Sequence, residues 1–466
     1  MHTLPGGLRT DQQPPTAIPL RHFVVALAFL VTAIGMGLVS LAASLPGLAR
    51  PATLHALLLG WICLTIMGAM TQFVPVWSGV TLHSRRLATA QLWLVTVGLA
   101  GFVWLLLAGA LEFVPLFATL ILAGLWTFVY NVGRTLARSR PFDFTERHFA
   151  VALCSFAVVA PLGYALALDF TMGVFDSVAL TRTDVILLHA TLALFGGVLP
   201  TIVGALSQLG KMFTQATLEP IDESLQTLET ITLPTGALLL AVGRGFDVVL
   251  VARVGALAVL VGAAAFAVVV VRLLVRATAD SSPMTARYWI VAVSLASWIA
   301  LTATAWWAEP IGYGTLFGHP DATVLLVVGV FGFVVVGTLY HIVPFIIWHD
   351  RYSDRLGFEP VPMIDDLYSS RLERVDFWTS VVGLSGIAVS SLLSVPSEVG
   401  IAGGSLLAIG FALFVVNMLR TIHRHGPGGL GGVLISSIPS TTAARASSDS
   451  SGEIDDPVDE SGQTSD

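Results

Sequence analysis

Charged residues are scarce in this chain, and their scarcity excludes a soluble globular fold. Asp, Glu, Lys and Arg make up 11% of the 466 residues, whereas hydrophobic residues make up 55%, and the mean hydropathy is +0.82. A soluble protein of this length needs a larger polar surface. The composition therefore predicts a polytopic protein whose main partner is the lipid bilayer, and it gives no indication of nucleic-acid binding.

Cysteine and lysine are nearly absent. The two cysteines, Cys63 and Cys154, fall within apolar runs, which excludes a disulfide framework and a CxxC metal site and leaves packing roles for both. Lys211 is the only lysine, and the segment from Ser447 onward carries acidic residues but no basic ones. Acidic, lysine-poor segments are tolerated where salt screens their charge, so we expect a halophilic source. The sequence also lacks P-loop and nucleophile-elbow motifs.

Long apolar runs are abundant, and each is long enough to cross ~30 Å of hydrocarbon as a helix. They lie at 22–43, 53–77, 87–109, 111–133, 148–169, 184–208, 226–243, 246–275, 286–307, 322–348, 375–395 and 399–422. We therefore predict an all-α integral membrane fold with twelve transmembrane helices. The flanking segments are expected to be a cytoplasmic leader at 1–20 and a disordered acidic tail at 426–466, because the tail cannot bury enough apolar area to fold.

The distribution of arginine and lysine predicts the orientation. If the N-terminus is cytoplasmic, 19 of the 23 Lys and Arg residues fall in inner segments and three in outer ones. The positive-inside rule then places both termini in the cytoplasm of a multi-pass protein of the cell membrane. An even number of spans agrees with this orientation.

Two residue frames recur along the chain and predict three repeated units of four helices. The first frame is Gly60, Gly68, Gln72 and Pro75, then Gly196, Gly204, Gln208 and Lys211, then Gly329, Gly337, His341 and Pro344. The second is Gly124, Phe128, Arg134 and Arg138, then Gly262, Phe266, Arg272 and Arg276, then Gly410, Phe414, Arg420 and Arg424. This long period suits a bundle of repeated helix groups, with units at about 21–140, 148–276 and 286–424.

Three histidines near the outer ends of spans are candidate cofactor ligands. His55 begins the second span, His189 lies near the start of the sixth, and His319 precedes the tenth. An imidazole inside a bundle can ligate a haem iron or a metal through one nitrogen while a hydrogen bond holds the other. Each could equally be an interfacial histidine satisfied by water or a carbonyl, and spacing alone does not pair them.

Other polar residues within the spans have structural interpretations first. His341 aligns with Gln72 and Gln208, about 25 Å along a helix from the level of His55, so we expect these three side chains to bond helices together rather than to share a ligand. Asp247 could pair with Arg244 at the outer surface. A proton path through Glu229 is a further hypothesis, because ionisable groups inside membranes are costly.

The twelve spans, the repeated units and a His at the outer end of the second span, followed by the Gly, Gln and Pro frame, resemble the catalytic subunit of the haem-copper oxidase superfamily. That superfamily includes oxygen reductases and nitric oxide reductases, and the second span running into Trp77-Ser78-Gly79 is also similar to NnrS-type haem and copper membrane proteins. The resemblance covers about residues 20–425 and implies that His55 is an axial ligand of a low-spin haem.

The chain departs from the family pattern at most metal positions. The tenth-span ligands should fall at Ala322 and Val324, and the adjacent His-His pair for copper is absent from 226–243. His189 is about two residues from the sixth-span copper ligand, and Ala193 stands where the family has a tyrosine. The resemblance thus implies haem and argues against copper and against dioxygen reduction.

We therefore expect a divergent haem-copper-oxidase-subunit-I-like protein that binds haem through His55, with His189 and His319 as further cofactor candidates. Its implied roles are respiratory electron transfer or nitric oxide handling, as a haem-dependent oxidoreductase if it is an enzyme, together with a redox partner or other respiratory-chain subunits. The alternative is a cofactor-free transporter or structural subunit that keeps the fold, since many transporters also have internal repeats and interrupted helices.

Overall fold

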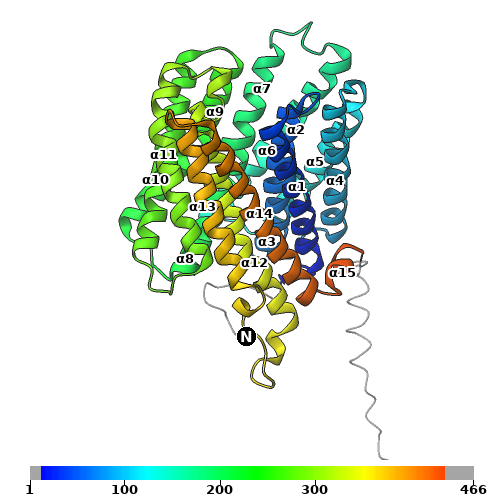
Figure 1. Ribbon diagram of the computed structural model, residues 1–466, viewed down its shortest axis with the longest axis vertical. Coiled ribbons are helices and arrows are strands. Elements are labelled where there is room, and N and C mark those ends of the chain that lie inside the picture. Colours follow the sequence, from blue (N-terminus) through cyan, green and yellow to red (C-terminus); the bar gives the residue numbers. More distant parts are fainter. Residues whose placement is uncertain (1–11, 436–466) are drawn as a thin grey trace, which may run out of the picture.

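The computed structural model describes residues 12–435 and confirms the all-α membrane fold (Figure 1). Within this range, 12 helices are long and apolar enough to cross a membrane. They are α1 (Ala17–Ala42), α2–η2–α3 (Ala49–Ser78), α4 (Arg85–Ala108), η3–α5 (Leu111–Leu136), α6 (Phe144–Met172), α7–η4–α8 (Arg182–Thr214), α9 (Pro220–Gly245), α10 (Val249–Val275), α11 (Pro283–Ala308), η7–α12 (Leu325–Arg351), α13 (Ser370–Leu392) and α14 (Ser397–His425). A short helix, α15 (Gly429–Ile435), follows.

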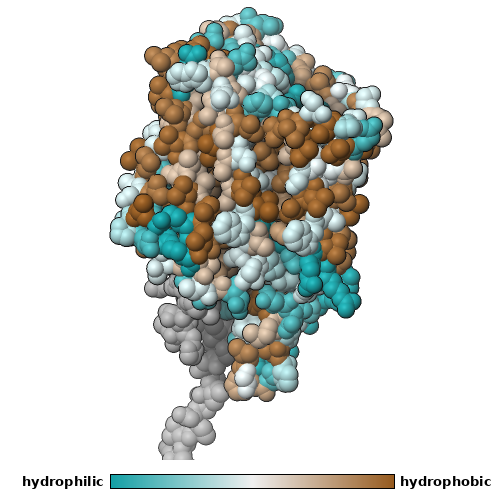
Figure 2. Space-filling view, turned by 60° about the vertical axis from the view of Figure 1, so that its left-hand side comes forward, coloured by the Kyte–Doolittle hydropathy of each residue, from teal (hydrophilic) through white to brown (hydrophobic). Residues whose placement is uncertain are grey.

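The outer surface matches a bilayer environment. Figure 2 shows apolar side chains covering the middle of the visible face, with hydrophilic groups gathered towards its two ends. Lipid tails cannot satisfy polar groups, so helices that face lipid expose apolar side chains there. Trp104, Leu116 and Leu250 are examples, with 70%, 63% and 72% of their surface exposed. The molecule is thus a multi-pass membrane protein.

Three spans form the centre of the bundle. The apolar windows of Ala49–Ser78, Arg182–Thr214 and Leu325–Arg351 are 72%, 67% and 83% buried, against 22–61% for the other spans. Within the described residues these same three spans contain the π-helical segments: η2 (Ala56–Cys63), η4 (Leu192–Val198) and η7 (Leu325–Gly332). A π segment inserts an extra residue per turn and often marks a functional site. Each of the three central spans is therefore interrupted by one π-helical segment, at corresponding positions.

The glycines of the first frame lie where neighbouring helices touch. A Cβ added to Gly68, Gly204 or Gly337 would come within 2.7, 2.8 or 3.2 Å of a side-chain Cβ on α1, α6 or α11. The contacted residues are His22, His148 and Arg287, respectively. Small residues let helix backbones approach closely in membranes. Helix contact is therefore a sufficient structural reason for the repeated glycines.

The glycines of the second frame also lie at helix contacts. These contacts are within the peripheral helix pairs α4–α5, α9–α10 and α13–α14. A Cβ on Gly124, Gly262 or Gly410 would lie 2.6, 2.9 or 2.2 Å from an atom of the preceding helix. In α9–α10, two arginines of the frame also form ion pairs, because Arg272 Nε donates to Asp222 at 2.5 Å and Arg276 contacts Glu219 at 3.0 Å. These charges sit at the end of the pair where α9 begins.

The start of the tail differs from its expected disorder. Residues 429–435 form α15, whose Leu430, Val433 and Leu434 pack on the apolar core. Arg21 Nε on α1 donates to the Val433 carbonyl oxygen at 2.8 Å. Apolar residues at i, i+3 and i+4 give this Gly-rich segment a face to bury, which the composition alone did not reveal. The acidic part of the tail at 436–466, and residues 1–11 of the leader, lie outside the described residues.

Of the two cysteines that were expected to pack, Cys63 is buried and Cys154 is exposed on α6. The packing prediction was therefore wrong for Cys154, because the apolar environment of that residue is the outer, lipid-facing surface.

The glycine contacts predict a position-specific effect of adding one methyl group. Gly124→Ala should lower the free energy of unfolding by about 1–3 kcal/mol, the usual cost of overpacking, because the new Cβ would lie 2.9 Å from the backbone nitrogen of Val95. Gly133→Ala on the same helix is the control, since nothing lies within 4 Å of its added Cβ. Thermal unfolding in detergent checks both variants. Equal melting temperatures for the two would contradict the close contact.

Candidate functional site

His55 is held at the point where the second span changes from α to π geometry. It is the last residue of α2 (Ala49–His55), and η2 begins at the next residue. Its Nδ1 donates to the Pro51 carbonyl oxygen at 2.8 Å, and its ring lies 5.0 Å from the ring of Phe102 on α4. Because a carbonyl oxygen can only accept, Nδ1 carries the proton, and the neutral ring has a free lone pair on Nε2.

His189 is held in the same way by a different helix. It lies on α7, just before η4, and its Nδ1 donates to the Val159 carbonyl oxygen of α6 at 3.0 Å. Gly163 of α6 faces this ring, and a Cβ there would lie 2.9 Å from Cε1 of His189. The glycine therefore lets the imidazole pack closely against the backbone of α6. Hydrogen-bonded Nδ1 with free Nε2 is the common state of a ligating histidine.

The two imidazoles face each other although they are far apart in the sequence. Their ring centroids are 6.4 Å apart and their planes differ by 23°. A metal ion bound to one nitrogen of each of two opposed imidazoles would hold the centroids about 6 Å apart, since each metal–nitrogen bond is about 2 Å long. Both rings are partly exposed rather than packed shut. The observed centroid distance is close to this value, and two separate spans thus bring a pair of imidazoles to one place in the bundle.

His319 does not join this pair among the described residues. It precedes η6 (Pro320–Ala322), its Nδ1 accepts a hydrogen bond from the Asp321 amide at 3.3 Å, and its own amide donates to Thr302. Throughout residues 12–435, no group of three or more His, Cys, Asp or Glu side chains could hold a metal ion. The candidate site thus offers two protein ligands, His55 and His189.

Arg244 reinforces this region at the end where α9 finishes, and its contacts correct the expected pairing with Asp247. The Arg244 side chain is fully buried and donates to the carbonyl oxygens of Pro310, Thr315 and Leu316 and to the Thr191 hydroxyl, at 2.8–3.2 Å. Asp247 instead lies in the turn after α9 with φ of 54°. The outer loop supplied carbonyls that the sequence did not show, and it ties α9 to the helix that carries His189.

The expected cross-bonding of His341 with Gln72 and Gln208 is wrong. Among the described residues, Oε1 of Gln72 is buried without a hydrogen-bond partner. The His341 ring instead packs against the rings of Phe213 and Phe345, at 4.4 and 5.7 Å between centroids. Equal depth along three helices did not bring the three polar groups together, because depth does not determine the direction in which each side chain points.

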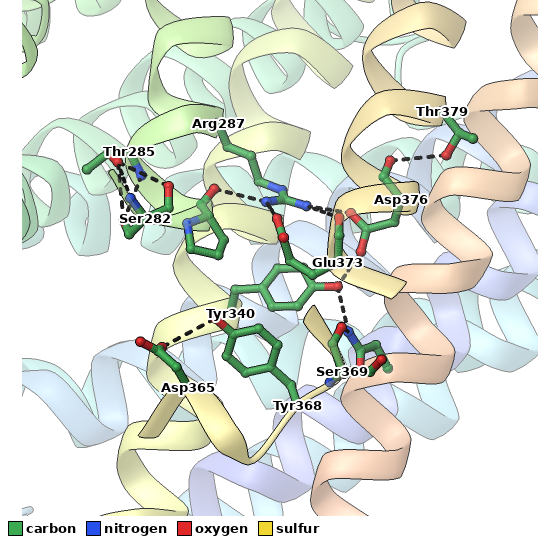
Figure 3. A network of polar contacts seen from close by, with 12 residues as sticks. Ser282, Thr285, Arg287, Tyr340, Asp365, Tyr368, Ser369, Glu373, Asp376 and Thr379 are labelled. Carbon is green, nitrogen blue, oxygen red and sulfur yellow. Dashed lines mark hydrogen bonds and ion pairs between the residues drawn. The ribbon is translucent and has the colours of Figure 1, made fainter. Parts of the chain in front are cut away.

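A second polar region lies at the opposite end of the central spans. Arg287 on α11 is 1% exposed, and it donates to Glu373 at 2.6 Å and also to Asp376 on α13. Figure 3 shows the Tyr340 hydroxyl pointing to the same Asp376 carboxylate. Asn417 of α14 donates in turn to the Tyr340 oxygen at 3.1 Å. This network joins α11, α12, α13 and α14.

The sequence interpretation assigned Arg287 to an inner loop and did not single out the network. The feature that marks Arg287 is its contact with a frame glycine. Arg287 contacts Gly337 as His148 contacts Gly204. Tyr368 lies beside the network (Figure 3), and burial raises the pKa of its hydroxyl, with a further rise from Asp365 and Glu373. The hydroxyl is therefore a neutral hydrogen-bond donor to Asp365.

Comparisons with known proteins do not assign this arrangement. A scan against protein-family models finds no match to the chain. A search of curated proteins finds none either. The chemistry of the site is therefore inferred from its geometry.

The buried ion pair predicts a large effect of removing its cation. Arg287→Ala should lower the free energy of unfolding by about 3–5 kcal/mol, because it leaves buried carboxylates without a counter-charge. Arg355→Ala is the control: that residue pairs with Glu359 at an exposed position, and its loss should cost about 0–1 kcal/mol. Thermal unfolding in detergent measures both, and a similar small effect for the two would show that the Arg287 network does not stabilise the fold.

Proposed function

We propose that this chain is a haem-binding membrane protein in which His55 and His189 would hold the haem, and that it acts in electron transfer. The observation that carries the proposal is the pair itself: two imidazoles from separate central spans, 6.4 Å apart between centroids, each with Nδ1 bound to a backbone carbonyl. Intramembrane histidines that converge inside a bundle are a functional arrangement by default.

The number of ligands favours a haem over a bare metal ion. Two histidines are too few for the four-coordinate sites that zinc prefers in proteins. A haem iron brings four ring nitrogens of its own and needs only axial ligands from the chain. Both histidines are half-buried rather than fully enclosed, which supports this choice. No dedicated copper site is proposed, in keeping with the missing histidines.

Two axial imidazoles favour electron transfer over chemistry on a bound gas. When bound, the haem would supply a one-electron redox centre whose potential depends on its axial ligands and their hydrogen bonds. His55 and His189 would hold the haem iron, and the Pro51 and Val159 carbonyls would keep their rings oriented and raise their basicity. Dioxygen reduction needs an open iron position, so we do not propose it.

The proposal revises the pairing that the family resemblance implied. The resemblance placed the partner of His55 on the tenth span, whereas the residues that meet here are on the second and sixth. We also propose that the fold consists of three related four-helix units. The support is the matching place of η2, η4 and η7 and the matching helix contacts of Gly68, Gly204 and Gly337.

The ligand assignment predicts which histidine variants change the spin state. Low-temperature electron paramagnetic resonance of the oxidised full chain in detergent should show a low-spin haem signal. His55→Ala and His189→Ala should each remove most of that signal, because five-coordinate haem iron is high-spin and weakly held. Gly163→Leu should also reduce haem content, since its side chain would collide with the His189 ring and displace it.

His319→Ala is the matched control and should keep the full signal. If His189→Ala keeps an unchanged low-spin signal, the assignment of His189 fails. A wild-type chain that remains free of haem after expression in a haem-replete host would instead favour the cofactor-free alternative, a transporter or structural subunit.

A further inference from the structure

Glu229 and His148 form a buried pair away from the histidine pair of the proposed function. Glu229 on α9 and His148 on α6 are each 1% exposed, and His148 Nε2 lies 3.0 Å from Glu229 Oε1. The other ring nitrogen, Nδ1, lies 2.8 Å from the Phe144 carbonyl oxygen. Since that oxygen can only accept, Nδ1 must carry a proton. One further proton is then shared between Nε2 and the carboxyl group.

The surroundings of Glu229 favour its neutral form. Among the described residues, its second oxygen, Oε2, is buried without a hydrogen-bond partner. A carboxylate with an unsolvated oxygen in an apolar interior is far more costly than a carboxylic acid in the same place. The arrangement of lower cost is a Glu229 hydroxyl that donates to Nε2 of a neutral His148. The pair then carries no net charge.

Two matching positions in the bundle show what is special about this one. His22, His148 and Arg287 each contact a frame glycine and each bond the carbonyl oxygen four residues earlier. Across from Arg287 the acid is Asp376, and its partner Arg keeps its charge at any physiological pH. On α4, Gln91 stands as far before the frame glycine Gly124 as Glu229 stands before Gly262. Gln91 has no ionisable group. The His148 pair therefore combines a carboxyl group with a base that can give up its proton.

A small cavity adjoins Glu229. Its polar lining consists of Glu229, Ser207 and Gln226, and the remainder is apolar side chains of α6, α8, α9 and α10. The space accommodates about one water molecule, and such a site holds water when polar partners are present. Gln226 is partly exposed and lies one helical turn nearer the start of α9. Among the polar residues of the lining on α9, Gln226 is thus the one nearer that end of the bundle.

We propose that Glu229 and His148 form an exchangeable proton-binding site within the membrane domain, with Glu229 as the proton carrier and the adjoining cavity as its access for water. The carboxyl proton of Glu229 exchanges for a proton of the cavity water, so the charge and the atoms of the pair are unchanged. This site does not depend on haem binding at His55 and His189, because it uses other residues, although α6 borders both.

Infrared spectroscopy of the full chain in lipid tests the proposal. At neutral pH, the wild-type protein should show the carbonyl stretch of a protonated carboxylic acid that Glu229→Gln removes, with an amplitude of about one group per chain. Asp376→Asn is the matched control and should keep this band. After transfer to D₂O, the band should shift to lower frequency during the buffer exchange, because the acid proton reaches water.

Two results would overturn the proposal. Superimposable wild-type and Glu229→Gln spectra in this region would mean that Glu229 is ionised. A band that keeps its frequency in D₂O for hours would mean that the proton is trapped and the site does not exchange. If Glu229→Gln fails to fold, Glu229→Asp serves in its place, since the shorter acid should move the band rather than remove it, and an unmoved band would assign it to another residue.

Discussion

The structure depends on one constraint: polar groups inside a membrane have no lipid partner to bond with, so a group left unpaired there is costly. The close helix contacts at Gly68, Gly204 and Gly337 bring α1, α6 and α11 against the three central spans. Polar side chains at these contacts are then forced into reach of carbonyls and of acids on neighbouring helices. The Arg287 network and the His148–Glu229 pair are two solutions to the same problem.

The same constraint applies to the two histidines of the candidate site. His55 and His189 each use one nitrogen to bond a carbonyl, which secures the ring and leaves the second nitrogen available. They stand beside η2 and η4, where the helices lose regular geometry. Arg244 ties the end of α9 to this region through four hydrogen bonds. A redox centre at one end and a proton site towards the other would place two kinds of charge carrier in one bundle.

Much of the fold was predictable, because apolar length and recurrent glycines are local properties of a sequence. The spans and the frames needed no knowledge of which helices touch. His55 and His189 were identifiable as intramembrane histidines, but their pairing was not, since spacing gives depth along a helix and not direction around it. The same limit explains the errors at Gln72, Gln208 and His341. The predicted pairing of Arg244 with Asp247 was wrong because Arg244 bonds backbone carbonyls of a loop. A sequence does not reveal such partners.

The most direct test of the central claim is the absorption spectrum of the wild-type chain. The full chain should be purified in detergent from a haem-replete host, and its reduced-minus-oxidised spectrum recorded with iron and copper quantified on the same sample. A haem held by His55 and His189 predicts sharp haem bands, about one iron per chain and no stoichiometric copper. A colourless, iron-free preparation of the folded protein would contradict the account.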